Sequence, residues 1–114
     1  MSLPEPLRDL FDLLSRRHVL PVVWELRGPA QPFRTLAQRL AAPEAQLSQR
    51  LRELRESGLA EVDEAGDYRL TGEGRRLLDL LEALDTFADG WANMSPRRRR
   101  PRGAASSGRG EPSP

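Results

Sequence analysis

The sequence has no cysteine, no lysine and no isoleucine among its 114 residues, and its only histidine is His18. Without cysteine there is no disulfide, no thiolate nucleophile and no cysteine-based zinc site. A single histidine cannot supply a multi-histidine metal site. We interpret His18 as a residue at the start of a helix, partly packed under Leu36 or Leu40, rather than as a catalytic base. We therefore expect no enzyme activity, no metal and no cofactor.

Long apolar runs are also missing. No stretch approaches the roughly 20 residues that a membrane-spanning helix needs. The N-terminal segment carries Glu5 and Asp9 and lacks the order of a signal peptide, in which basic residues precede an apolar stretch. We expect a cytoplasmic protein without a membrane partner, and the length and the 38% hydrophobic content suit one small domain.

Charge is unevenly distributed along the chain. Residues 1–93 carry 12 arginines against 16 acidic residues, a net charge of −4, whereas residues 94–114 carry six arginines against Glu111, a net charge of +5. The second segment holds almost nothing that can be buried, so we predict a domain over 1–93 and a disordered basic tail over 94–114. Such a tail can follow a phosphate backbone without fixed geometry. A solubilising extension is the alternative interpretation.

Apolar residues recur at helical spacing in five segments. The predicted helices cover 5–15, about 18–27, 35–41, about 43–57, and a long stretch that begins after Thr71. Thr35 and Gln38 have the spacing of a capping box, Pro43 stands in the first turn of its helix, and Thr71 is a cap. The last helix is apolar over more than half of its circumference, which predicts two partners: its own core and a second subunit.

Between Gly58 and Thr71 the hydrophobic period changes from helical to two. Leu59, Glu61 and Asp63 alternate with Ala60 and Val62, Gly66-Asp67 has the composition of a turn, and residues 68–70 (YRL) follow. This pattern predicts a β-hairpin. The fold class is therefore mainly α with one small hairpin.

Four segments stand in a fixed order along the chain. They are Val22-Val23-Trp24-Glu25-Leu26 with Gly28-Pro29, then Phe33-Arg34-Thr35-Leu36, then residues 47–59 (LSQRLRELRESGL), then residues 68–75 (YRLTGEGR). In sequence and in order they resemble the HxlR group of bacterial transcription regulators, within the wider set of MarR-like and PadR-like winged helices. The resemblance implies a winged helix-turn-helix with an additional N-terminal helix and a long C-terminal helix for dimerisation.

The resemblance also implies a function. It indicates a sequence-specific, DNA-binding transcriptional regulator that acts as a homodimer through helix 1 and the C-terminal helix, with the recognition helix at about 43–57 in the major groove of double-stranded DNA. The sequence departs from the family pattern at His18, where tryptophan is usual, and at Ala42, where a serine cap is usual. It also lacks the N-terminal cysteine, which excludes the cysteine-based oxidant sensing of some relatives, and it identifies no effector.

The candidate DNA contacts follow from placing Leu47, Leu51 and Leu54 toward the core. The opposite face of that helix then carries groove-reading side chains, because glutamine can pair with an adenine edge and arginine with a guanine edge or a phosphate. The predicted contact residues are Arg34, Thr35, Arg39, Gln46, Ser48, Gln49, Arg50, Arg52 and Arg69, with Arg55 a further phosphate candidate by position. The alternative is a solvated face with pairs such as Arg52 and Glu56 at spacing four.

The predicted hairpin is acidic, with Glu61, Asp63, Glu64 and Asp67 against a single Arg69. Like charge repels phosphate, so this hairpin is a poor grip on a DNA backbone. The second functional hypothesis is therefore a winged-helix protein-interaction module that has kept the fold and lost DNA binding. Salt-dependent binding to duplex DNA separates the two hypotheses.

Overall fold

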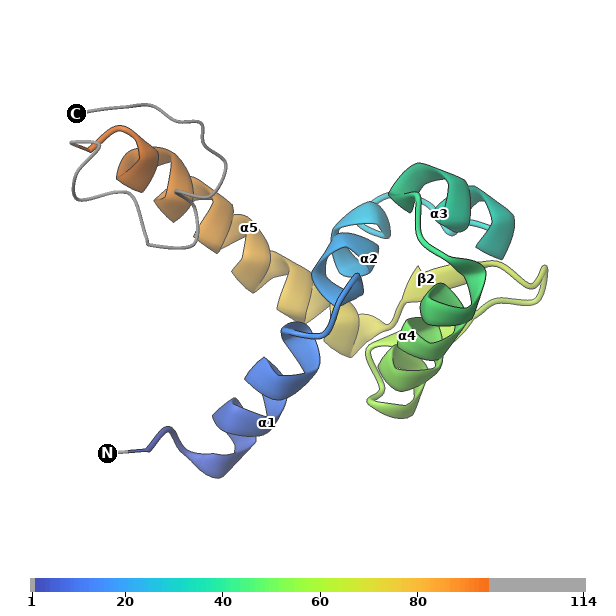
Figure 1. Cartoon of the computed structure of the whole chain (residues 1–114), viewed down its shortest axis with the longest axis horizontal. Helices are drawn as coiled ribbons and strands as arrows, with labels where there is room; N and C mark the ends of the chain where they lie inside the picture. The colour runs from blue at the N-terminus through green and yellow to red at the C-terminus, as the bar shows by residue number, and fades with distance from the viewer. Residues whose placement is uncertain (1, 95–114) are drawn as a thin grey trace. The chain divides into compact units, whose positions relative to one another are not determined.

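The computed structural model describes residues 2–94, so the tail predicted for 94–114 lies outside the described residues beyond Met94. The chain divides into two compact units, one up to Asp79 and one from Leu80. No helix formed by residues 2–94 is long and apolar enough to cross a membrane. The elements, shown in Figure 1, are α1 (Glu5–Leu14), α2 (Val19–Glu25), α3 (Phe33–Leu40), α4 (Glu44–Glu56), β1 (Ala60–Val62), β2 (Tyr68–Leu70) and α5 (Gly72–Ala92).

The core of the first unit is aliphatic. α2 contacts α1, α3 and α4, and α4 contacts β1, so α2 lies at the centre of the packing. No polar side chain and no aromatic side chain among the described residues is buried. The largest fully buried side chains come from α2, its C-terminal end, α3 and α4: Val19, Val22, Val23, Leu26, Leu36, Leu47, Leu51 and Leu54. The predicted core face of the fourth helix is confirmed.

α3 and α4 form the helix-turn-helix, and α3 begins two residues before the predicted start. Its N-cap is Pro32, with φ −69° and ψ 156°, and no side chain caps it. Thr35 therefore lies inside the first turn, and the predicted capping box is wrong. Proline fixes its own φ near the value that this cap uses, so the chain enters the helix there. Pro43 is likewise the N-cap of α4 rather than its first helical residue.

α2 is shorter than predicted. It runs from Val19 to Glu25, with Leu26 at the C-cap, rather than from about 18 to 27. His18 is the N-cap, as a helix-start residue, and has a positive φ of 74°. Pro21 lies in the first turn, as predicted, because the amide hydrogen it lacks would have no partner within the helix there.

The turn between α3 and α4 contains an alanine in a left-handed conformation, Ala41 with φ 51°. A side chain with a Cβ is strained there, by about 1–2 kcal/mol per residue. We expect Ala41→Gly to raise the free energy of unfolding by about 1 kcal/mol, since relief of strain exceeds the extra freedom that glycine gives the unfolded chain. Ala37→Gly, inside α3, is the control and should lower it by about 1 kcal/mol. Urea unfolding measures both, and no gain for Ala41→Gly would mean that the turn is unstrained.

The predicted hairpin is confirmed. β1 and β2 are antiparallel and pair Ala60 with Leu70, Glu61 with Arg69 and Val62 with Tyr68. The backbone of Gln31 exchanges two hydrogen bonds with Tyr68, at 2.9 and 2.8 Å. The extended link between α2 and α3 is thus attached to the outer edge of the hairpin.

The start of α5 is joined to the rest of the first unit by three residues. The Thr71 hydroxyl oxygen accepts the Gly74 N–H at 3.0 Å and donates to the Gly58 carbonyl at 2.6 Å, which confirms the predicted cap. Arg75 donates to the carbonyls of Arg27 and Gly28, at 2.9 and 3.3 Å. Gly74 is buried, and a Cβ on it would collide with the Leu59 carbonyl oxygen. These contacts connect the start of α5 with residues 58–59, just before β1, and with residues 27–28, just after α2.

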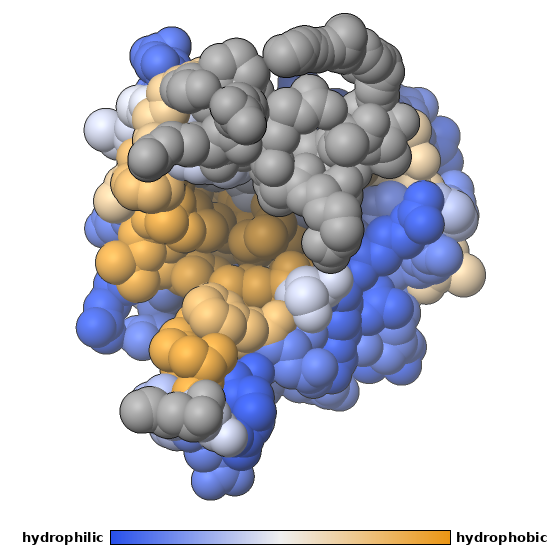
Figure 2. Space-filling model, turned by 60° about the vertical axis from the view of Figure 1, so that its left-hand side comes forward, coloured by the Kyte–Doolittle hydropathy of each residue, from blue (hydrophilic) through white to orange (hydrophobic). Residues whose placement is uncertain are grey.

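Both ends of the described chain carry exposed apolar side chains. In the first unit, α1 has no buried residue and exposes Leu7 and Phe11, with Leu3 just before it. In the second unit, Leu80, Leu84 and Phe87 are 63%, 58% and 67% exposed. Their spacing of four and three residues places them on one face of α5. Figure 2 shows exposed apolar residues in orange on the side of the molecule that it presents.

Candidate DNA interface

α4 presents a polar face on the side opposite its buried leucines. Gln49 and Arg52 are exposed on that face, and Gln46 and Ser48 are exposed on its two flanks. Arg50 is only partly exposed. The side chains predicted to contact base edges are therefore accessible on the second helix of the helix-turn-helix.

The predicted arginines differ in their partners. Arg39 pairs with Glu25 at 3.1 Å, Arg50 with Glu53 at 2.8 Å and Arg69 with Glu61 at 2.8 Å. Three other arginines make no ion pair within residues 2–94: Arg34 on α3, and Arg52 and Arg55 on α4. The Arg52–Glu56 pair of a simple solvated face is therefore absent from the described part of the chain.

The second half of α4 and β1 line a groove of about 550 Å³. Its walls include Arg52 and Arg55 on the helix and Glu61 on the strand. Glu56 also lies on the helix side of the groove, so the formal charge of the two arginines is reduced there to a net +1. The pairing of Glu61 with Arg69 reduces the negative charge that the hairpin side presents.

Part of the hairpin's acidity has a structural role. The Asp63 carboxylate accepts the backbone N–H groups of Ala65 and Asp67, both at 2.9 Å. Gly66, with φ 87°, supplies the left-handed residue of this turn. Two of the four acidic residues that weigh against a phosphate contact, Glu61 and Asp63, thus hold the hairpin together.

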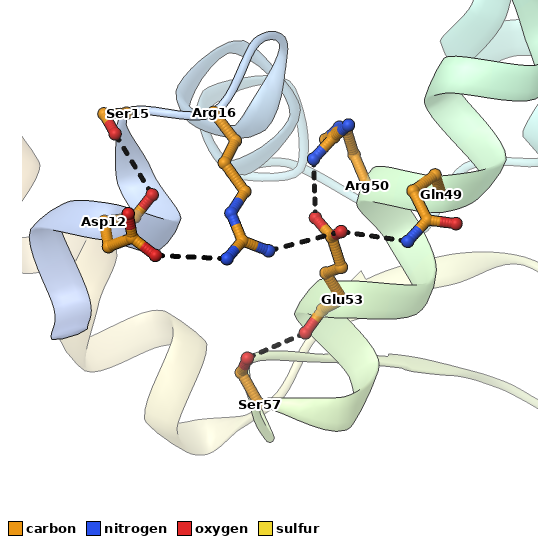
Figure 3. Close-up of polar contacts among 7 residues, drawn as sticks. All are labelled: Asp12, Ser15, Arg16, Gln49, Arg50, Glu53 and Ser57. Carbon is orange, nitrogen blue, oxygen red and sulfur yellow. Dashed lines mark hydrogen bonds and ion pairs between the residues drawn. The ribbon is translucent and has the colours of Figure 1, made fainter.

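One carboxylate of α4, that of Glu53, has three donors, as Figure 3 shows. It accepts from Gln49 Nε2 at 2.9 Å and from Arg50 Nη1 at 2.8 Å, and Arg16 Nη1 lies 3.2 Å away. Arg16 also donates to Asp12 of α1 at 3.1 Å. The hydrogen bond from Gln49 is the main cause that lowers the pKa of Glu53, with Arg16 and Arg50 adding to it and burial opposing it. Glu53 thus connects two predicted DNA-contact residues to the turn after α1.

A second polar contact joins this turn to α4. His18 Nε2 and Gln46 Oε1 are 3.0 Å apart. Gln46 and Glu53 are seven residues apart, two helical turns, and so lie on the same flank of α4. The turn between α1 and α2 therefore runs beside this flank, with His18 engaging another predicted contact residue.

Sequence reasoning missed the role of Glu53. Its spacing of four from Gln49 and three from Arg50 is that of local side-chain pairs on a helix, and this signal is present in the sequence. Its contact with Arg16, and that of His18 with Gln46, join residues far apart in the chain and leave no such signal. Thr35 is half-buried in α3, so its side chain is less accessible than its predicted role requires.

Nothing in the described part of the chain resembles a metal centre, since residues 2–94 contain no group of three histidine, cysteine, aspartate or glutamate side chains able to hold an ion.

The chain is similar to a known protein family and to solved structures. The family model of the HxlR-like helix-turn-helix matches residues 13–96. The quinone-bound YodB from B. subtilis is 21% identical, with a TM-score of 0.72 over 77% of this chain and 99% of that one. The reduced form of the transcriptional regulator YodB is 20% identical, with a TM-score of 0.69 over 81% and 97%. No curated protein matches the chain significantly. At this identity the structural match supports the winged-helix fold.

Proposed function

The chain belongs to the HxlR-like helix-turn-helix family, and from this premise we propose that it is a homodimeric transcriptional regulator with α4 in the major groove of its DNA site. The observation that carries the proposal is the polar face of α4. Gln49 and Arg52 lie opposite three buried leucines, on the second helix of a helix-turn-helix. In this motif the second helix enters the major groove, and its outward side chains contact base edges.

The arginines around α4 support contacts to the DNA backbone. Arg34, Arg52 and Arg55 are exposed and have no ion-pair partner within residues 2–94. Their guanidinium groups therefore lose no existing ion pair when they meet phosphate. Arg39, Arg50 and Arg69 each have a carboxylate partner, so a phosphate contact from them competes with an existing bond.

The apolar surfaces support a homodimer. Exposed leucine and phenylalanine on α1 and on the second half of α5 form two apolar faces, which a second copy of the chain would cover. A two-fold axis makes such contacts self-complementary. The interface should bury more than about 1,200 Å² in total. Two recognition helices one DNA turn apart, about 34 Å, would then read a two-fold-related site.

Alanine substitutions test the assignment of the recognition helix. The DNA site is first identified by selecting bound fragments from genomic DNA. We then expect Gln49→Ala and Arg52→Ala each to reduce the free-energy preference for one base at one position per half-site by about 1–3 kcal/mol. Arg34→Ala should weaken binding to all sequences alike and reduce the salt dependence, because it removes a phosphate contact and its released counterion. Fluorescence anisotropy at several salt concentrations measures both effects.

The opposite result would favour the interaction module. If the parent protein prefers no DNA over competitor at any salt concentration, or if Gln49→Ala and Arg52→Ala fold and bind like the parent, α4 is not a recognition helix. The acidic hairpin would then be explained by a protein partner instead of DNA.

A further inference from the structure

We propose that Glu53 and Arg16 determine base preference without touching DNA, by holding the Gln49 side chain in one orientation. The proposal rests on the DNA-binding function proposed above and assigns positioning roles to two residues outside the predicted contact set. Its basis is the arrangement in Figure 3, in which Asp12, Arg16, Glu53 and Gln49 form one continuous chain of polar contacts.

The chain of contacts places Glu53 beside the exposed polar face of α4 that is proposed to contact the bases. Gln49 lies on the exposed face of α4, whereas the Glu53 side chain is only 15% exposed and lies on the flank toward the turn after α1. The bond from Gln49 Nε2 to Glu53 Oε2 is 2.9 Å long. Arg16, from a different element, lies 3.2 Å from the same oxygen and so fixes the carboxylate from the other side. The orientation of Gln49 therefore depends on a residue 33 positions earlier in the chain.

The chemistry of the amide makes this arrangement useful for recognition. A glutamine amide has two N–H donors and one carbonyl acceptor. One N–H donated to Glu53 leaves the other N–H and the oxygen, which are the pair that an adenine edge requires. An unattached glutamine side chain loses rotamer freedom when it binds, and it can also turn its amide to suit another base. Fixing the amide reduces the entropy cost of binding and selects one donor and acceptor pattern.

Arg50 completes the support around Glu53. Its Nη1 donates to the second carboxylate oxygen, Oε1, at 2.8 Å. Both oxygens of Glu53 are therefore engaged by donors, and the carboxylate has little freedom to turn away from Gln49. A bond of this kind between charged groups is stronger than one between neutral groups.

A simpler role for Arg16 predicts a different result. If Arg16 were itself a phosphate contact, Arg16→Ala would weaken binding to every sequence by the same factor and reduce the salt dependence. If it only stabilised the fold, its loss would change the melting temperature and leave the ratio of affinities unchanged. Base preference is therefore the readout that a positioning role alone would alter.

The experiment uses two DNA sites: the selected site, and the same site with a changed base pair at the position where Gln49→Ala reduces the preference. It measures the ratio of the protein's affinities for these two sites. We expect Arg16→Ala and Glu53→Ala each to lower this ratio by about 2- to 150-fold, the range of coupling between contacting residues. In the Gln49→Ala background neither substitution should change the ratio further. Arg76→Ala is the matched control, because it also removes an exposed arginine from an ion pair, with Glu73 at 3.1 Å, and should leave the ratio unchanged.

Each other outcome has a defined meaning. If Gln49→Ala relaxes the preference but Arg16→Ala and Glu53→Ala do not, the positioning role is wrong and the DNA-binding function stands. The positioning role is also wrong if Arg16→Ala and Glu53→Ala lower the affinity ratio equally with Gln49 present and with Gln49 replaced by alanine, because the effect would then not depend on the glutamine. If the parent protein has no base preference, the proposed function fails, and the positioning role fails with it.

Discussion

Replacing Phe87 by glutamate is expected to raise the dissociation constant of the proposed homodimer by about 100- to 10,000-fold. Burial of a phenylalanine side chain contributes about 1.5–3 kcal/mol, and two-fold symmetry removes two copies at once. At about 1.4 kcal/mol per factor of ten, the loss of both copies gives this range. The side chain is 67% exposed in the single chain, so the substitution should not unfold the protein. Sedimentation equilibrium measures the constant directly.

The control for Phe87→Glu introduces the same residue one position earlier. Thr86 is exposed and lies about 100° around the helix from Phe87, in the direction away from Leu84. Thr86→Glu should leave the dimer intact. A parent protein that is monomeric at tens of micromolar, and that does not aggregate, would contradict the homodimer. The apolar faces of α1 and α5 would then belong to a different partner.

Gly74→Ala is expected to destabilise the first unit, although alanine is the better helix former by about 1 kcal/mol. An added Cβ would collide with the Leu59 carbonyl oxygen and press on Leu70 Cβ. The obstruction is largely backbone, which cannot turn away as a flexible side chain can, so the start of α5 must move away from Leu59 and Leu70. Overpacking of this kind costs about 1–3 kcal/mol, occasionally more. Urea unfolding measures the change in free energy.

A neighbouring glycine provides the comparison. Gly72 lies two residues earlier in the same turn, and nothing stands within 4 Å of a Cβ built on it. Gly72→Ala should therefore be neutral or slightly stabilising. If Gly74→Ala is as harmless as Gly72→Ala, the close approach of α5 to the start of β1 is not a constraint on the fold.

Local patterns in the sequence predicted most of the fold. The change of period after Gly58 located the hairpin, because alternation over a few residues is a direct sign of a strand. Thr71 was identified as a cap because a threonine oxygen can accept the N–H three residues on, and Gly74 supplies that N–H. Leu47, Leu51 and Leu54 gave the core face of α4 from spacing alone. In each case the deciding interaction lies within one element or one turn.

The errors arose where two local signals competed or where the partner was distant. Thr35 matched a capping pattern, but the extended segment already ends at Pro32, so α3 begins at Phe33, before Thr35. For the candidate site, the sequence identified the exposed side chains of α4 but not which of them already have partners. The contact between Arg16 and Glu53 depends on how the turn after α1 lies beside α4, and this is decided by tertiary packing.

The aliphatic core has a consequence for spectroscopy. Because no aromatic side chain of the described residues is buried, the intrinsic fluorescence arises outside the core. The two tryptophans belong to different units: Trp24 is in α2, with the Arg27 guanidinium 5.0 Å from its ring centroid, and Trp91 is near the end of α5. Variants that keep one tryptophan each would give two separate optical signals. The emission of Trp24 reports on the helix-turn-helix unit, and that of Trp91 on the surroundings of the second unit.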